Sequence, residues 1–391
     1  MKRDETLPRV RDLMQEYARM TGLAPAGPQP QRYLWTDAFA VCTYLELFRQ
    51  NSDVTFRDCA LRLIGQVHHT LGRYRGDDER TGWISGRGEE GGEQHPTTGG
   101  LRIGKPLNER GPAEPYDERR EWDRDGQYYH YLTKWMHALS ATARVTGDPL
   151  YLRWAMELVQ AVHPRFTSLT PSGGRKRMYW KMRIDLSAPL VPSMGQHDPL
   201  DGFVTYNELQ AAANQDFRTS ALPDLNAQIT DIAAICRGMN LVTDDPLGIG
   251  GLLFDASRIA RLVTRGHPGY LRLLESVVGA ALPGLKSFAG SGYLQHPAEY
   301  RLAFRELGLS IGLSGVSMIQ DCIMECSDRS AGHSSLCRRV DNLLDYVPMR
   351  ETIERFWLDE GNRQAVTWTE HRGINLVMLA TSLAPGGFLE I

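Results

Sequence analysis

The sequence feature that most constrains the fold is a pair of helical patterns separated by a very short turn. Apolar side chains recur at helical spacing through residues 127–146 and again through 149–164. Between them stands Gly147-Asp148-Pro149, in which glycine suits the residue after a helix, aspartate an N-cap and proline a first helical turn. Two helices joined so closely must run antiparallel, so the sequence predicts a helical hairpin.

The same pattern recurs along the chain and predicts an all-α fold. Residues 38–42 and 374–380 are apolar nearly all round, whereas 54–72 and 149–164 carry charges on one face. Helices of the first kind are buried and those of the second kind lie outside them. We therefore expect an (α/α)6 toroid of helical hairpins, with residues 1–391 as a single domain. The expected helices lie near 5–20, 36–49, 54–72, 127–146, 149–164, 203–217, 224–240, 251–264, 268–283, 297–312, 315–326, 334–346 and 372–382.

Two long segments interrupt the helical pattern. Residues 76–126 are rich in glycine and charge, but Trp83 and Trp122 favour an ordered cap over a flexible tail. Within 165–202, apolar Met178, Trp180 and Met182 alternate with polar neighbours, which predicts a short β-hairpin. We expect both insertions to cap one rim of the toroid.

Composition excludes several classes of protein. The chain has 44 Lys+Arg against 47 Asp+Glu, so nothing indicates a nucleic-acid partner. No run approaches the roughly 18 apolar residues that span a bilayer, so no membrane is expected. The charged N-terminus does not resemble a secretory signal, and six cysteines are too few for a disulfide framework. These features predict a cytoplasmic protein, and they leave the oligomeric state open.

Acidic and aromatic residues gather just before the helices that we expect to be buried. Alternate helices of an up-down toroid begin at the same end, so these clusters should converge on one rim around the central cavity. The clusters contain Trp35 and Asp37; Glu121, Trp122, Asp123, Asp125 and Tyr128; His197, Asp198 and Asp201; Tyr293 and His296; and Glu370, His371 and Arg372.

The cluster from Glu121 to Tyr128, followed by an aromatic-rich helix, resembles the funnel motifs of the six-hairpin (α/α)6-barrel superfamily. That superfamily includes glycoside hydrolases, unsaturated glucuronyl hydrolases and N-acylglucosamine 2-epimerase-like proteins. The resemblance covers roughly residues 30–385 and concerns architecture. It implies a small carbohydrate substrate in an aromatic-lined, carboxylate-bearing funnel. No single family's catalytic pattern matches in full, so no catalytic residue is carried over.

The leading hypothesis is a glycoside hydrolase, because that reaction needs one protonated carboxyl and one carboxylate. We expect Asp123 or Asp125 as the acid and Asp198 or Asp201 as the base. Acidic residues at these positions could instead be helix caps or form salt bridges. Further catalytic candidates are Glu121 and His371, and the substrate-binding candidates are Trp35, Asp37, Trp122, Tyr128, Trp180, His197, Glu370 and Arg372.

Two other functions stay open. A sugar epimerase or isomerase would use histidines as acid and base near neutral pH, with His95, His130, His197 and His371 as candidates. A non-catalytic protein would instead bind a ligand in a cavity whose charged groups are all paired. We expect no cofactor and no metal. A zinc site formed by Cys322, Cys326, His333 and Cys337 is chemically possible, but its spacing matches no standard zinc knuckle.

Overall fold

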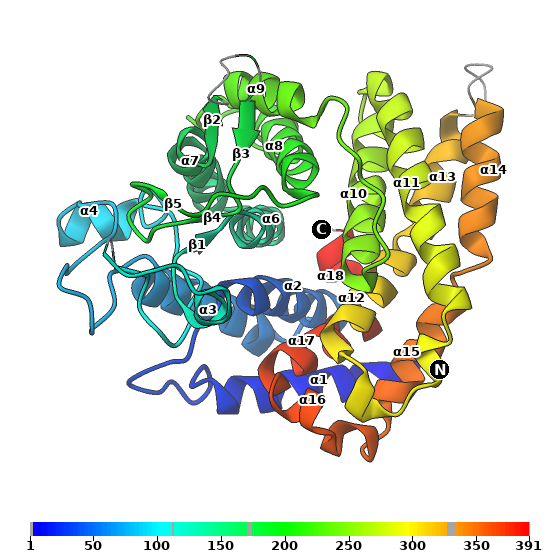
Figure 1. The fold of residues 1–391 in the computed structure, drawn as a ribbon, viewed down its shortest axis with the longest axis horizontal. Coiled ribbons are helices and arrows are strands. Elements are labelled where there is room, and N and C mark those ends of the chain that lie inside the picture. Colours follow the sequence, from blue (N-terminus) through cyan, green and yellow to red (C-terminus); the bar gives the residue numbers. More distant parts are fainter. Residues whose placement is uncertain (1–2, 112, 170–173, 175, 327–332, 391) are drawn as a thin grey trace. The chain divides into compact units, whose positions relative to one another are not determined.

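The computed structural model describes residues 3–390 except 112, 170–173, 175 and 327–332 (Figure 1). These residues form two compact units, Ala18–Gly238 and the combination of Met1–Tyr17 with Met239–Ile391. Both units are built of helices, and the strands are short and antiparallel. The predicted all-α class with a short β-hairpin in an insertion is confirmed.

The unit Ala18–Gly238 contains three packed helix pairs among its described residues. They are α2 (Leu34–Asn51) with α3 (Val54–Leu71), α6 (Tyr129–Thr146) with α7 (Pro149–Phe166), and α8 (Asp198–Gln215) with α9 (Asn226–Cys236). The turn between α6 and α7 has the predicted chemistry. Gly147 has φ 73°, and the Asp148 side chain accepts a hydrogen bond from the Leu150 N–H.

The inner and outer helices of this unit differ in burial, as predicted. Helix α2 is buried on every side from Leu34 to Leu47, whereas α3 and α7 bury one face. Helix α6 contacts both α2 and α8 and therefore lies between them. The Tyr33 and Tyr131 hydroxyls are 2.6 Å apart, and Thr133 Oγ1 donates to Asp201 at 2.5 Å. The starts of α2, α6 and α8 therefore lie at the same end of the unit.

The insertions of this unit supply its strands. A three-stranded sheet has the order β1 (Gln127–Tyr128), β4 (Lys181–Met182) and β5 (Pro189–Val191), and β2 (Thr167–Leu169) pairs with β3 (Lys176–Met178). Helices α4 (Glu89–Gln94) and α5 (Glu118–Asp123) lie in the first insertion. Trp83 and Leu101 are buried there, as an ordered cap requires. Strand β1 runs directly into α6, so both insertions meet at the start of the central helix.

The other unit is also a stack of helix pairs. Helix α10 (Pro246–Thr264) packs on α11 (Leu271–Gly290) and on α12 (Ala303–Ser314), and α12 packs on α15 (Met349–Leu358) and α17 (Arg372–Leu383). A Cβ on Gly250 would lie 2.2 Å from the Gly308 carbonyl oxygen, so glycine lets α10 and α12 touch. The remaining helices are α1 (Arg3–Met20), α13 (Val316–Cys326), α14 (His333–Leu344), α16 (Val366–Thr369) and α18 (Gly386–Leu389), with 3-10 turns at Pro268–Tyr270, Tyr293–Gln295, Ala298–Tyr300 and Asn362–Gln364.

Several helices differ from the prediction; α10, for example, begins at Pro246 instead of 251, and α12 begins at Ala303 instead of 297. Helix α8 begins at Asp198, five residues before the predicted 203, because Asp198-Pro199 already forms the first turn. Helix α15 was not predicted, since only Ile353, Glu354 and Trp357 of its ten residues are buried.

One helical stretch of the described chain, Ala303–Glu325, is long and apolar enough to cross a membrane by length and composition alone. However, 67% of its apolar window is buried inside the protein. The stretch comprises α12 and α13, which both pack against α10. The stretch is therefore apolar because it forms part of the core of this unit.

Candidate functional site

An aromatic row crosses the end of the unit where α2, α6 and α8 begin. The Trp122 and Trp180 rings have centroids 5.8 Å apart, Trp180 stacks on Tyr128 at 4.8 Å, and Tyr128 stacks on His130 at 5.6 Å. His130 in turn contacts Tyr131 at 4.7 Å. Tyr131 continues the row to Tyr33 and Trp35. Trp122 is 55% exposed, so the row runs from solvent to the start of α2.

The β-sheet holds the middle of this row in place. Strand β1 pairs with β4, and the Tyr129 N–H donates to the Trp180 carbonyl oxygen at 3.1 Å, which sets Tyr128 beside Trp180. The buried Lys181 ammonium lies over the Tyr128 ring, 5.4 Å from its centroid. Lys181 donates to the Glu121 side chain at 3.1 Å and to the Glu121 carbonyl oxygen at 2.6 Å. The aromatic row is therefore a fixed surface.

Pairs of basic and acidic side chains connect α6 with α8 beneath the row. His130 Nδ1 lies 3.8 Å from Asp198, and Lys134 Nζ lies 2.7 Å from Asp201. One turn deeper, His137 Nδ1 lies 3.8 Å from Glu208. On α6 these residues are at i, i+4 and i+7, which places them on one helical face. The first pair is the one that reaches the solvent, because 37% of the His130 side chain is exposed.

Asp198 and His130 form an unusual acid–base pair. Burial raises the pKa of Asp198 to about 7, and the nearby Asp201 charge adds to the effect. Among the described residues Asp198 Oδ2 has no hydrogen-bond partner. Burial lowers the pKa of His130 to about 4, with a further contribution from Lys134. At neutral pH the imidazole is therefore uncharged and lies beside a carboxyl that can gain or lose a proton.

A glycine keeps the Asp198 carboxyl in position. A Cβ on Gly195 would lie 2.3 Å from Asp198 Oδ2, so any other residue there would displace the carboxyl. Gly195 therefore permits the close approach of the loop that leads into α8.

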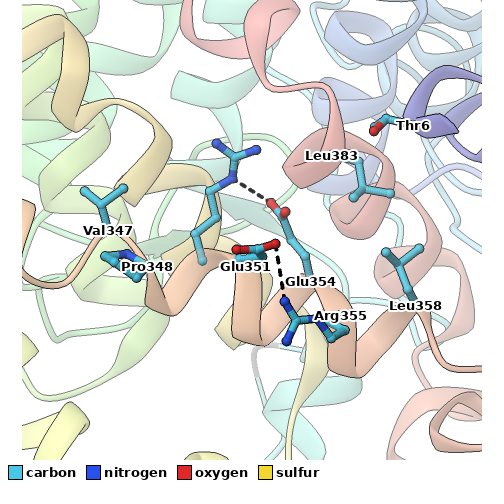
Figure 2. Close-up of a pocket in the computed structure, with 9 residues that line it drawn as sticks. Thr6, Val347, Pro348, Glu351, Glu354, Arg355, Leu358 and Leu383 are labelled. Carbon is cyan, nitrogen blue, oxygen red and sulfur yellow. Dashed lines mark hydrogen bonds and ion pairs between the residues drawn. The ribbon is translucent and has the colours of Figure 1, made fainter. Parts of the chain in front are cut away.

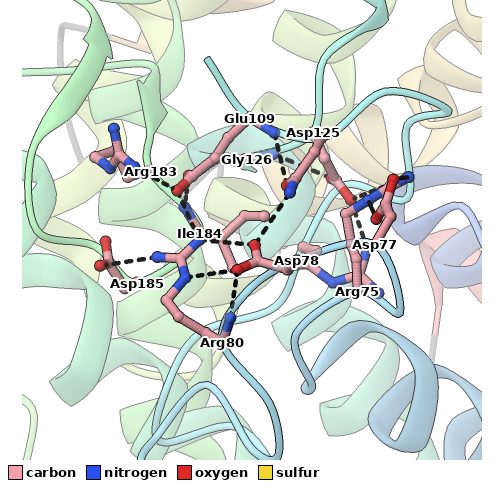
Figure 3. A network of polar contacts seen from close by, with 12 residues as sticks. Arg75, Asp77, Asp78, Arg80, Glu109, Asp125, Gly126, Arg183, Ile184 and Asp185 are labelled. Carbon is pink, nitrogen blue, oxygen red and sulfur yellow. Dashed lines mark hydrogen bonds and ion pairs between the residues drawn. The ribbon is translucent and has the colours of Figure 1, made fainter. Parts of the chain in front are cut away.

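The surroundings of Asp125 are the opposite of those of Asp198. Its Oδ2 accepts from Arg102 at 2.5 Å and from Arg75 at 3.5 Å, and its Oδ1 accepts from the backbone N–H groups of Gly104 and Gly126. Figure 3 shows that this carboxylate belongs to a network of ion pairs in the insertion. A second centre of that network is Glu109, which accepts from Arg80, Arg183 and the Ile184 N–H. Both oxygens of Asp125 are thus occupied by donors, as the salt-bridge alternative predicts.

The other acidic candidates of this unit have structural partners or lie in solvent. Glu121 is buried and pairs with Lys181 and with Arg110, the latter at 3.2 Å. Asp37 lies in the first turn of α2, where it accepts from the Tyr33 N–H at 2.9 Å and pairs with Arg32 at 3.3 Å. Asp123 is exposed.

The remaining histidine candidates lie apart from the aromatic row or in the other unit. His197 immediately precedes α8 and is half-buried, and His95 Nδ1 pairs with Glu157 at 2.8 Å. In the other unit His371 packs against Phe304 with ring centroids 5.4 Å apart. There Arg372 pairs with Glu16 at 2.6 Å and Glu370 is exposed. Convergence of these last three residues with the aromatic row stays a prediction.

The structure thus brings together Trp35, Trp122, Tyr128, Trp180, Asp198 and Asp201 from the predicted set. Sequence reasoning missed Tyr131 and Lys134. A sequence pattern could have identified Lys134, because it lies four residues after His130, on the same face of a helix whose other face is apolar.

The unit that contains α15 has a cavity of about 670 Å³ (Figure 2). Its charged groups are paired: Arg350 with Glu354 at 2.8 Å and Arg355 with Glu351 at 3.3 Å. Glu354 also accepts from the hydroxyls of Ser310 and Ser382. A cavity with satisfied charges is what a binding site without catalysis requires.

No group of three or more His, Cys, Asp or Glu residues in the described part of the chain is placed to hold a metal ion. Cys322 is buried in α13. The side chains of Cys326 and His333 lie outside the described residues, so the four-residue zinc pattern is untested.

The solved structures that are similar to this chain include two sugar epimerases. No family model and no curated protein matches the chain. A sugar epimerase from a ruminal bacterium has TM-score 0.46 and 10% identity, covering 90% of this chain and 87% of that chain. Cellobiose 2-epimerase from Spirochaeta thermophila DSM 6192 has TM-score 0.46 and 14% identity, covering 95% of this chain and 97% of that chain.

Proposed function

We propose that the protein is a sugar-processing enzyme that moves a proton at a carbon next to a carbonyl, as sugar epimerases and isomerases do. The observation that carries the proposal is the half-exposed His130 imidazole, 3.8 Å from a buried carboxyl whose pKa is about 7. An imidazole that is uncharged at neutral pH can accept a proton, and an adjacent carboxylate can stabilise the imidazolium that forms. The two similar structures are both described as sugar epimerases, but the proposal takes its support from His130 and Asp198.

The proposed step starts with the His130 nitrogen that does not face Asp198. This nitrogen, Nε2, accepts the proton from the carbon beside the carbonyl, and the electron pair of the broken C–H bond forms an enediolate. The Asp198 carboxylate stabilises the resulting imidazolium through Nδ1. Return of the proton from Nε2 to the neighbouring carbon, with transfer of the enediol hydroxyl proton from one oxygen to the other, gives the isomer. Protonation of the original carbon from the other face by a water molecule gives the epimer, and the imidazolium then releases its proton to solvent.

The aromatic row supplies the surface for the sugar. Tyr131 and Trp180 are partly exposed beside His130 and its stacking partner Tyr128, and aromatic faces can cover the apolar C–H faces of a pyranose. Tyr128 is 2% exposed and supports these rings from within the protein. Among the described residues the buried indole N–H of Trp180 has no hydrogen-bond partner. Stacking thus orients the ring, and polar groups at its edge select the hydroxyls.

The hydrolase hypothesis receives less support. A glycosidase acid must donate a proton to the leaving oxygen. Both oxygens of Asp125 already accept hydrogen bonds, and Asp123 is exposed. The non-catalytic alternative fits the cavity beside α15, whose charges are paired, but it gives no reason for a buried carboxyl oxygen without a partner at Asp198.

Proton exchange with solvent tests the proposal directly. The protein is incubated in D2O with a panel of free aldoses and reducing disaccharides, and NMR follows deuterium at C1 and C2. We expect exchange with the wild-type protein and its loss in His130→Gln. His267→Gln, an exposed histidine of the other unit, is the control and should exchange normally. Release of new reducing ends without deuterium incorporation would contradict the proposal and favour a hydrolase.

A further inference from the structure

We propose that Lys105 and the hydroxyl pair of Tyr33 and Tyr131 form a subsite for an anionic group, so that the substrate is an acidic sugar bearing a carboxylate or a phosphate. This inference rests on the proposed function, because the subsite adjoins the same aromatic row as His130. It adds the substrate class, which the acid–base pair alone does not specify.

The loop before Lys105 is pinned against the start of α2. The Leu34 N–H donates to the Ile103 carbonyl oxygen at 3.0 Å. Gly104 has φ +91°, and a Cβ there would lie 2.2 Å from the Arg32 carbonyl oxygen, so only glycine allows this approach. As a result the Lys105 ammonium lies 5.5 Å from the centroid of the Tyr33 ring.

The ammonium of Lys105 forms no hydrogen bond and no ion pair with any residue that the structure describes. Its electrostatic neighbours are Asp123 and Asp125, and Asp125 is already engaged by Arg102 and Arg75. Partial burial lowers the pKa of Lys105. Apart from the Tyr33 ring, this partly desolvated cation has no hydrogen-bond or ion-pair partner among the described residues, which is unfavourable, and an anionic ligand would offset that cost.

The tyrosine pair adds a hydrogen-bond donor beside this cation. The two hydroxyl oxygens are 2.6 Å apart, so one hydroxyl donates to the other and the second proton is available to a ligand oxygen. Burial raises the pKa of Tyr33 to about 12, so this hydroxyl keeps its proton at neutral pH. Helices α2 and α6 also begin here, and their N-terminal ends favour negative charge.

Ring contacts link the subsite to the proposed chemistry. Lys105 lies over Tyr33, Tyr33 contacts Tyr131 with centroids 5.5 Å apart, and Tyr131 contacts His130 at 4.7 Å. A sugar whose reacting carbon is at His130 can therefore extend an acidic substituent along Tyr131 toward Lys105.

Calorimetric binding of glucose, glucuronate and glucose 6-phosphate at low salt tests the inference. We expect the wild-type protein to bind at least one of the two acids about tenfold or more tightly than glucose, as a charge-assisted contact allows. The two acids distinguish a carboxylate from a phosphate. Lys105→Met should abolish most of this ratio and Lys105→Arg should keep it. Lys286→Met, the same charge change at an exposed lysine of the other unit, should leave the ratio unchanged. A wild-type protein without the preference, or a Lys105→Met variant that retains it, would overturn the inference.

The outcome is separable from that of the proposed function. Asp198→Asn should lose deuterium exchange while keeping the acid-to-neutral binding ratio. If the acid-to-neutral binding ratio depends on Lys105 but the wild-type protein shows no deuterium exchange, the anionic subsite stands and the proposed reaction is rejected. If the protein exchanges deuterium into neutral sugars but does not prefer acidic ones, the proposed reaction stands and the anionic subsite is rejected.

Discussion

Asp125 and Asp198 are both buried carboxyl groups beside the start of a helix of the same inner set, yet their surroundings are opposite. Asp125 is met by two guanidinium groups and two backbone N–H groups (Figure 3). Asp198 has a half-exposed imidazole at 3.8 Å and one oxygen without a partner among the described residues. The first carboxylate is fully compensated and holds the insertion together. The second has an oxygen that no described residue compensates, and the proposed function makes use of this carboxyl.

The largest expected effect separates the two carboxyls by turnover. Asp198→Asn should lower the rate constant for the sugar reaction by about 10²–10⁴-fold, the usual contribution of a positioned acid–base group. The variant should remain folded, because an amide of the same shape replaces a group that is poorly solvated. Steady-state rates on whichever sugar shows deuterium exchange, with circular dichroism as the folding control, provide the measurement. An unchanged rate would remove Asp198 from the mechanism.

The free energy of unfolding should depend on Asp125 more than on Asp198, the reverse of the order expected for turnover. Asp125→Asn leaves the Arg102 guanidinium, which is nearly buried, without its carboxylate, and breaking a buried pair in this way costs about 3–5 kcal/mol. Urea unfolding should therefore show a large drop in the free energy of unfolding for Asp125→Asn and none for Asp198→Asn at pH 8. Equal losses in both variants would mean that the two carboxyls do not differ as described.

The pH dependence of stability should distinguish Asp198 further. Its pKa in the folded chain is about 7, above the usual 3.8. Its stabilising contribution is therefore fully present below pH 3.8 and is lost as pH rises through 7. The free energy of unfolding of the wild-type protein relative to Asp198→Asn should fall by about 2–3 kcal/mol between pH 5 and pH 8. Urea titrations of both proteins at the two pH values measure this difference, and a constant difference would place the carboxyl in water-like surroundings.

The smallest effect is expected for an exposed ion pair. Arg355 and Glu351 are 75% and 64% exposed, so Arg355→Ala should change the free energy of unfolding by no more than about 0.5 kcal/mol. This variant calibrates the Asp125 result, because it removes a guanidinium–carboxylate pair that water already screens. A loss comparable with that of Asp125→Asn would show that burial is not the deciding variable.

Local chemistry made much of the fold predictable. Gly147, Asp148 and Pro149 act within a few residues of themselves, so the α6–α7 hairpin could be read directly. Helix α15 escaped prediction because Glu354, a charged residue, occupies part of its buried face and accepts from serines of other helices.

The sequence predicted several residues of the candidate site but not their surroundings. Asp125 and Asp198 have the same signature in sequence, an acid near a helix start. The contacts that Arg102 and Arg75 make across 23 and 50 residues, together with the N–H groups of Gly104 and Gly126, set Asp125 apart. The order of rings from Trp122 to His130 likewise depends on the register of β1 with β4, which no local pattern specifies.

Gln127 illustrates a constraint on how such a protein can change over evolution. Its buried side chain accepts from the Leu101 N–H and donates to the carbonyl oxygens of Gly99 and Ile184, so one amide ties both insertions to the strand that becomes α6. Neither insertion can be shortened or exchanged without disturbing the other and the helix that carries His130. New specificity in this scaffold should therefore arise by point substitution along the row of rings, or by transplanting the two insertions as a matched set.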